Sequence, residues 1–198
     1  MIVLIRLALV WIAAFRRKKL DGDGISSLLQ RVWPGDLDWN MHMNNGRYFS
    51  AADIGRFDWW MRSGLWRAVR QRGWRPVAGD STARFSQSLL PFQRYKLRTR
   101  MLGWTGKWFF AEHRFVLQER VCALIVVRYL FVADDGGTRP APAEVMEAIG
   151  WAEASPLLPE WVLQWSAGQD QLSVELKNAA TSSSSASSAP KPTASGTR

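Results

Sequence analysis

The sequence has few of the residues on which disulfide and metal chemistry depend. Its 198 residues include a single cysteine and only two histidines. One cysteine excludes an intrachain disulfide and any zinc or iron–sulfur site built from several cysteines. With two histidines, a metal site would have to rely on carboxylates, and we expect no metal and no redox cofactor. The 47% share of hydrophobic residues nevertheless predicts a globular protein with a sizeable core.

Acidic residues are also few, and the N-terminal end has none. The chain has 26 Lys and Arg against 17 Asp and Glu, a formal net charge of +9. The first 20 residues contain no acid and carry +5 of that excess, on Arg6, Arg16, Arg17, Lys18 and Lys19. The remainder is therefore only mildly basic and lacks a nucleic-acid-binding motif, so we expect no nucleic-acid partner.

The N-terminal leader, residues 1–20, is apolar but short. Fourteen of its first 15 residues are apolar, whereas a spanning helix needs about 20, and Arg6 would oppose insertion by about 2.5–3.5 kcal/mol. The basic cluster follows the apolar run, the reverse of the order in a cleavable signal peptide. Three alternatives remain: a short membrane anchor, an interfacial helix, or a helix that packs on its own domain. An anchor would keep the basic cluster and the domain on the cytoplasmic face of the membrane, and we expect a cytoplasmic location.

The composition of the C-terminal end predicts no folded structure. Residues 178–198 are rich in Ser, Ala and Pro and contain no large apolar residue, which is typical of a disordered tail. The folded domain is therefore expected over residues 25–177.

Within this domain the pattern predicts one long helix and an antiparallel sheet. Asn44 is a candidate N-cap for a helix that ends at Gly64 or Gly73. Alternating or continuous apolar runs predict strands, and two short helices are expected after them. The strands are expected at 28–33, 83–89, 95–101, 108–117 and 122–132, and the helices at 142–149 and 159–165. This order is typical of the α+β class.

One dense motif lies where the first strand leads into the long helix. The run Asp36–Tyr48 combines carboxylates, several amides and an imidazole. The start of a helix offers unpaired N–H groups and a positive dipole end that can hold an oxyanion. A carboxylate nearby can act as a base or nucleophile, and acyl transfer from a thioester needs this combination.

The run Asp-x-Asn-x-His-Met-Asn-Asn-x-x-Tyr at 38–48 resembles the signature of hotdog-fold thioesterases of the 4-hydroxybenzoyl-CoA and acyl-ACP thioesterase type. The stretch 85–92 resembles that family's strand ending in a proline turn, and 98–104 resembles its next strand. The resemblance implies a single hotdog domain, a long central helix wrapped by an antiparallel β-sheet. It also implies a homodimer or larger homo-oligomer with active sites at the subunit interface. The activity that it implies is hydrolysis of acyl-CoA in preference to acyl-ACP.

Carried over to this sequence, the family pattern assigns each residue of the motif a role. Asp38 matches the acidic catalytic position, as general base or nucleophile, and Asn40 and His42 would position the water and the carbonyl. The supporting loop residue is Asn44, and the oxyanion would be held by the backbone at the helix start, Asn45, Gly46, Arg47 and Tyr48.

The sequence departs from the family in two places. Met41 stands where many members have glycine before the histidine. The further downstream carboxylate of the acyl-ACP enzymes has no clear counterpart here. Asp80 and Glu112 are the comparable acids, and neither lies in a recognisable motif.

Each of these residues also has a purely structural interpretation. Asp38 would form an Asx-turn, Asn44 would merely cap the helix, and His42 would orient the loop or line the dimer interface. A row of basic residues on one predicted strand is a candidate contact for coenzyme A phosphates or simply a solvated face; it comprises Arg94, Lys96, Arg98 and Arg100. Other residues are expected to be structural: Trp59, Trp60 and Trp66 in the core and the subunit interface, His113 at the surface or sheet edge, and Cys122 in the core. The alternative for some of the three Trp residues is the lining of an acyl tunnel.

The alternative function belongs to a different class. It is a catalytically weak, membrane-tethered hotdog protein that binds acyl chains or a protein partner, and the two departures from the family pattern favour it.

Overall fold

The structure, a computed structural model, describes residues 2–21, 23–151 and 153–186. The chain forms two compact units, the first ending at Leu158 and the second starting at Pro159. The second unit contains one helix, α5 (Glu160–Ala186), which is much longer than the helix expected at 159–165. It extends into the segment for which the sequence predicts a disordered tail, and the rest of that tail, 187–198, lies outside the described residues.

The first unit is built on one antiparallel sheet of five strands in the order β1-β3-β4-β5-β2. All five strands were expected, and the one at 108–117 has the expected bounds. The strands are β1 (Ser26–Arg31), β2 (Trp74–Phe85), β3 (Arg94–Thr105), β4 (Trp108–Leu117) and β5 (Arg120–Ala133).

The bounds expected for β2 were wrong, because the strand begins nine residues before 83. Its first half contains Pro76, Gly79 and Asp80, which break the alternation that would reveal a strand. An edge strand tolerates proline and needs no buried side of its own, and none of the residues of β2 is fully buried.

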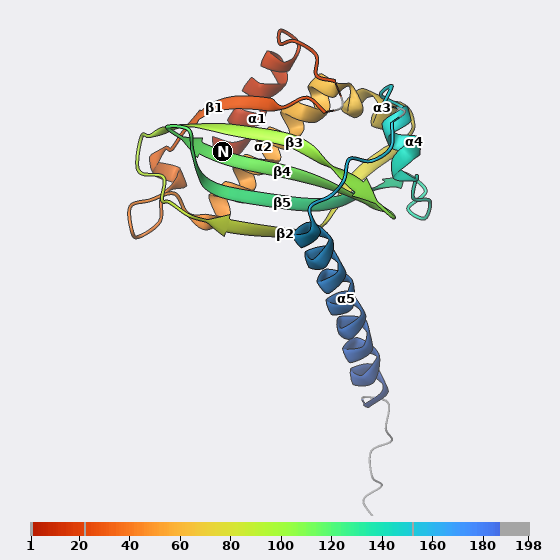
Figure 1. Ribbon diagram of the computed structural model, residues 1–198. Coiled ribbons are helices and arrows are strands. Elements are labelled where there is room, and N and C mark those ends of the chain that lie inside the picture. The colour runs from red at the N-terminus through yellow and green to blue at the C-terminus, as the bar shows by residue number, and fades with distance from the viewer. Residues whose placement is uncertain (1, 22, 152, 187–198) are drawn as a thin grey trace, which may run out of the picture. The chain divides into compact units, whose positions relative to one another are not determined.

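The helices of the first unit are α1 (Ile2–Ala14), α2 (Asn45–Ser63), α3 (Leu65–Gln71) and α4 (Pro142–Glu147). Helices α1 and α2 lie on the same face of the sheet (Figure 1). Asn44 caps α2 as expected, since its Oδ1 accepts a hydrogen bond of 2.8 Å from Gly46 N–H. The helix ends as expected at Gly64, whose φ of 83° suits glycine.

Helix α2 packs tightly on the middle of the sheet. A Cβ on Gly55 would collide with Thr99 Oγ1 on β3, so glycine is required for this close approach. The core between helix and sheet includes Tyr48, Ile54 and Phe115, all at most 2% exposed. A long helix buried against an antiparallel sheet is the single α+β hotdog domain that the sequence predicted.

His113 is not at the surface or the sheet edge, and that prediction was wrong. It lies on β4, the middle strand, is fully buried, and its Nδ1 lies 2.9 Å from Thr99 Oγ1. Burial, followed by the charge of Arg56, lowers its pKa well below 6.5, so the ring is neutral. Cys122 and Trp59 are buried in the core as expected.

The leader helix α1 packs on its own domain. Val10 and Ala14 are buried, and Arg6 forms an ion pair with Asp36. Among the residues that the structure describes, no helix is long and apolar enough to cross a membrane.

Candidate functional site

The motif folds into a tight loop between β1 and α2. Leu37 and Met43 pair as in an antiparallel bridge, and Asp38 N–H donates to His42 O across it at 3.0 Å. Met41, at the tip, has a φ of 56°, in the left-handed region that favours glycine. This geometry explains why glycine is common at that position in the family and makes Met41 a strained substitute.

The carboxylate of Asp38 has two partners within the loop. Its Oδ1 accepts a 2.9 Å hydrogen bond from Asn40 N–H, which is the Asx-turn of the structural interpretation. Its Oδ2 lies 3.3 Å from His42 Nδ1. The turn therefore orients the carboxylate toward the imidazole, and the two interpretations of Asp38 are compatible.

His42 also lines a small cavity of 190 Å³. Its other walls are Met43, Asn45 and Tyr48 of the motif and residues 85–88 at the end of β2. Asp38 is not part of the lining, so the imidazole reaches the cavity and the carboxylate lies behind it. This arrangement places an acid–imidazole pair, the start of a helix and an edge strand at one cavity.

Tyr48 forms an aromatic wall of this cavity. Its ring packs edge-on against Phe85 and Phe115, with centroids 5.1 and 4.9 Å away. Burial raises the pKa of Tyr48 above its ordinary value of 10. The phenol therefore stays protonated at neutral pH and adds no charge to the cavity.

The four backbone amides expected to hold an oxyanion are not equally available. Gly46 N–H donates to Asn44 Oδ1, and Arg47 N–H donates to Asn44 O at 2.9 Å. Tyr48 is the fourth residue of α2, where amides join the helical ladder. Among the described residues, Asn45 N–H has no acceptor, and Asn45 lines the cavity.

An ion pair that the sequence did not reveal supports the base of the loop. Asp36 is 2% exposed, and its two oxygens bind Arg6 of α1 at 2.6 and 3.3 Å. Asp36 Oδ2 also accepts from Trp33 N–H, and Asp36 O accepts from Asn44 N–H. From the sequence, Arg6 could be read only as an obstacle to membrane insertion. No local pattern predicts its ion pair with Asp36, which lies thirty residues later.

The basic row on β3 does not line this cavity, and most of it is engaged by acids. Lys96 and Arg98 bind Glu119 at 2.7 and 3.3 Å, and Arg100 binds Glu112 at 2.8 Å. Arg94 lines a different groove. The contact with coenzyme A phosphates stays a prediction.

The two acids considered as a further catalytic carboxylate are also engaged elsewhere. Asp80 Oδ2 binds Arg128 at 2.6 Å, and Glu112 binds Arg114 as well as Arg100. Neither acid lines the cavity beside His42.

Known proteins resemble the chain over this whole region. The model of the thioesterase-like superfamily matches residues 32–166. Protein THEM6 of Xenopus laevis is 34% identical over 149 residues, 74% of this chain and 69% of that protein. The leader, the His-Met-Asn-Asn run and the stretch 98–104 point to the same group of animal proteins, called thioesterase superfamily member six.

Solved structures agree on the fold. YbaW, a probable thioesterase from Escherichia coli, superposes with a TM-score of 0.59 at 16% identity and covers 64% of this chain and 97% of its own. A 4-hydroxybenzoyl CoA thioesterase variant, solved with 4-hydroxybenzoyl CoA, superposes with a TM-score of 0.54 at 18% identity. It covers 63% of this chain and 98% of its own.

Proposed function

The chain belongs to the thioesterase-like superfamily and is a thioester hydrolase, and we propose that it hydrolyses acyl-CoA in the cavity beside Asp38 and His42. The observation that carries the proposal is the position of the imidazole, which lines the cavity while the Asp38 carboxylate lies 3.3 Å behind it. A carboxylate–imidazole pair facing a cavity is the usual means of activating water for attack on an acyl group.

The reaction follows from these positions. The His42 ring acts as the general base and takes a proton from water while the water oxygen attacks the thioester carbonyl carbon, and Asp38 orients the ring and stabilises its protonated form. The negative charge that develops on the carbonyl oxygen is stabilised by Asn45 N–H and the positive end of α2. The carbon–sulfur bond then breaks, the coenzyme A thiolate leaves and takes up the proton, and the fatty acid is released.

The test measures release of free coenzyme A thiol by the full chain and by Asp38→Asn and His42→Asn. Each substitution is expected to lower kcat/KM by about 10²–10⁴-fold and to leave the unfolding midpoint close to that of the parent chain. Asp53→Asn, which changes an exposed carboxylate on α2, is the matched control. Equal losses from Asp53→Asn and Asp38→Asn would contradict the proposal.

A nucleophilic role for Asp38 makes a different prediction. Asp38 would then attack the thioester carbonyl and expel the coenzyme A thiolate, and water would attack the aspartyl carbonyl of the resulting anhydride. A single turnover in oxygen-18 water would therefore place the label in the Asp38 carboxylate, whereas direct attack of water on the thioester places it only in the released acid.

The choice of coenzyme A as the carrier is supported by the similarity to a 4-hydroxybenzoyl CoA thioesterase. The test is a panel of acyl-CoA substrates from short to long chains, with the matching acyl-ACP alongside. Release of coenzyme A at a higher kcat/KM than release of the carrier protein is expected. No turnover of any acyl-CoA, together with tight binding, would instead support the catalytically weak acyl-binding protein.

We also propose that two copies join through β2. This strand is an edge of the sheet, is twelve residues long and has no fully buried residue. A long exposed edge is a template for pairing with a second chain, and residues 85 to 88 at its end line the cavity. A dimer formed there would complete the active site from both subunits.

The leader supports a further proposal, that α1 lies on a membrane surface. Six large apolar side chains of this region are 47–70% exposed: Leu4, Ile5, Leu9, Trp11, Ile12 and Phe15. The basic residues 16–19 follow at once, which suits an anionic lipid surface. Co-flotation of the full chain with anionic vesicles but not with neutral ones is expected.

A further inference from the structure

A second hollow lies at the opposite edge of the sheet from the catalytic cavity. It has a volume of 460 Å³ and is formed by α1 and β1, and we call it the leader groove. This volume falls within the range of about 300–1,000 Å³ that is typical of small-molecule sites. Its floor is apolar and includes Leu9, Val10, Ala13, Leu28 and Leu29.

The walls of the leader groove are cationic. Four arginines line it, and no acidic residue does: Arg6, Arg17, Arg31 and Arg94. Arg6 and Arg17 are neutralised by Asp36 and Asp58. Among the described residues, Arg31 and Arg94 have no carboxylate within ion-pair distance.

Arg31 and Arg94 are also neighbours in the sheet, and the Arg31 guanidinium lies over the ring of Trp33, another residue of the groove, 5.5 Å from its centroid. They are direct cross-strand partners of β1 and β3, and like charges in this position are destabilising. An anion between them would relieve the repulsion, because guanidinium groups bind carboxylate oxygens with charge-assisted hydrogen bonds.

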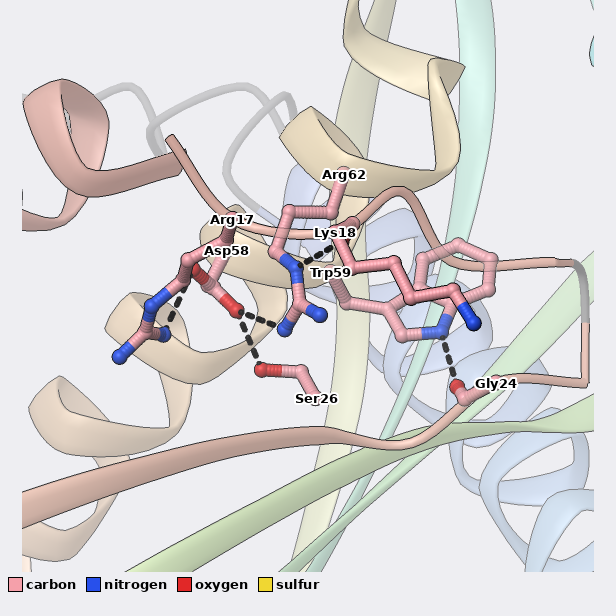
Figure 2. A network of polar contacts seen from close by, with 7 residues as sticks. All are labelled: Arg17, Lys18, Gly24, Ser26, Asp58, Trp59 and Arg62. Atoms are coloured by element: carbon pink, nitrogen blue, oxygen red, sulfur yellow. Dashed lines mark hydrogen bonds and ion pairs between the residues drawn. The ribbon is translucent and has the colours of Figure 1, made fainter. Parts of the chain in front are cut away.

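A buried polar network, which Arg17 links to the groove, joins the leader to β1 and α2 (Figure 2). Asp58 of α2, fully buried, lies between Arg17 and Arg62 and accepts a 2.6 Å hydrogen bond from Ser26 Oγ of β1. Arg62 Nε also donates to Lys18 O at 2.9 Å. The end of the leader, the start of β1 and the C-terminal part of α2 are therefore fixed to one another, which preorganises the groove at Arg17.

We propose that the leader groove binds a single long-chain fatty acid as its anion. The carboxylate lies between Arg31 and Arg94, and the chain lies along the apolar floor toward Leu9 and Leu28. This site is separate from the catalytic cavity, whose lining shares no residue with it. The proposal does not depend on hydrolysis, since it concerns binding of a free acid.

The experiment measures binding of the fluorescent fatty acid cis-parinaric acid to the full chain. One molecule is expected to bind per chain, and palmitate is expected to displace it while hexadecanol, with the same chain but no charge, does not. Equal displacement by hexadecanol would overturn the role of the arginines. Binding seen only when the acid is supplied in anionic vesicles would assign the groove to bilayer lipid and overturn the proposal.

Substitutions locate the site. The double variant Arg31→Gln/Arg94→Gln is expected to weaken binding at least about tenfold. The control Arg67→Gln/Arg120→Gln removes the same charge from exposed positions outside the groove and is expected to bind like the parent chain. Ala13→Trp fills the groove without changing charge and is expected to abolish binding.

The two sites are separated by the same assay. Asp38→Asn and His42→Asn are expected to bind cis-parinaric acid normally, whether or not they hydrolyse a thioester. Loss of binding in these variants, with retention in Arg31→Gln/Arg94→Gln, would place the acid in the catalytic cavity and contradict the proposal.

Discussion

The two edges of the sheet differ in length and in what lies beside them. At one edge, β1 is six residues long, α1 forms a groove with it, and Arg6 of α1 donates to the backbone carbonyl of Arg31. At the other edge, β2 is twelve residues long and is only partly buried. The residues that we propose for the chemistry lie beside the second edge, near Phe85.

The two edges differ in what lies beside the backbone N–H and C=O groups that have no partner strand. An exposed edge invites another chain to pair with it. Beside β1 lies the leader helix α1, and the two elements form the leader groove, whose volume is that of a small-molecule site. At β2 the edge stays exposed, and we propose that a second copy pairs with it beside the proposed catalytic cavity.

The largest effect on stability is expected from removing Asp58, which links the leader to α2 near the β1 edge. Asp58→Ala leaves Arg17 and Arg62 facing a site with no carboxylate, and removal of one partner from a buried ion pair costs about 3–5 kcal/mol. Chemical unfolding of the full chain measures this loss.

Asp53→Ala is the matched control for Asp58→Ala. Asp53 lies on the same helix and pairs with Arg56, but its side chain is 60% exposed, so the expected loss is below about 1 kcal/mol. Similar losses in the two variants would show that burial of Asp58 does not matter.

The second prediction sharpens the comparison by placing one lysine on each edge. Val77→Lys on β2 is expected to weaken dimerisation by about 10–100-fold, because an edge lysine opposes strand pairing. Leu29→Lys on β1, at a position that is 63% exposed, is expected to leave the dimer unchanged. Analytical ultracentrifugation distinguishes the two, and equal effects would remove the distinction between the edges.

The third prediction concerns β4, which lies between the edges. The pKa of His113 is lower in the folded chain than its unfolded value of 6.5, so below about pH 6.5 the unfolded chain binds more protons. The free energy of unfolding should therefore fall as the pH falls from 6.5, by at most about 1.4 kcal/mol per pH unit from this residue. His113→Gln should remove this part of the slope, and an unchanged slope would show that His113 does not cause it.

The smallest expected effect lies in the catalytic loop. The left-handed backbone at Met41 costs about 1 kcal/mol, and Met41→Gly removes that strain but adds about 0.5–1 kcal/mol of chain entropy in the unfolded state. Near-neutral stability and retained hydrolysis are expected, whereas Met41→Val should be destabilising because β-branched residues avoid this region. A stable Met41→Val variant would show that the φ value carries no strain.

Local patterns in the sequence predicted the parts of the fold that local forces determine. The Asn44 cap, the Gly64 terminus and the alternation of β3 each depend on a few neighbouring residues. The motif from Asp38 to Asn45 could be recognised because its residues are contiguous in the sequence, and its catalytic role stays a prediction.

The features that the sequence did not reveal depend on distant partners. Arg6 binds an acid thirty residues away, and Arg17 binds Asp58, forty-one residues away. Neither pair has a characteristic spacing. His113 was misplaced for a related reason, since a polar residue alternating along a strand indicates a surface unless its buried partner, Thr99, is known.

The ion pairs of the leader have a practical consequence for anyone who shortens this chain. Deletion of the first twenty residues is an obvious way to remove an apolar segment and improve solubility. It would also delete Arg6 and Arg17 and leave Asp36 and Asp58 as acids without those partners. Poor activity of such a fragment would therefore reflect a damaged catalytic loop and helix, and would say nothing about whether the protein works on a membrane.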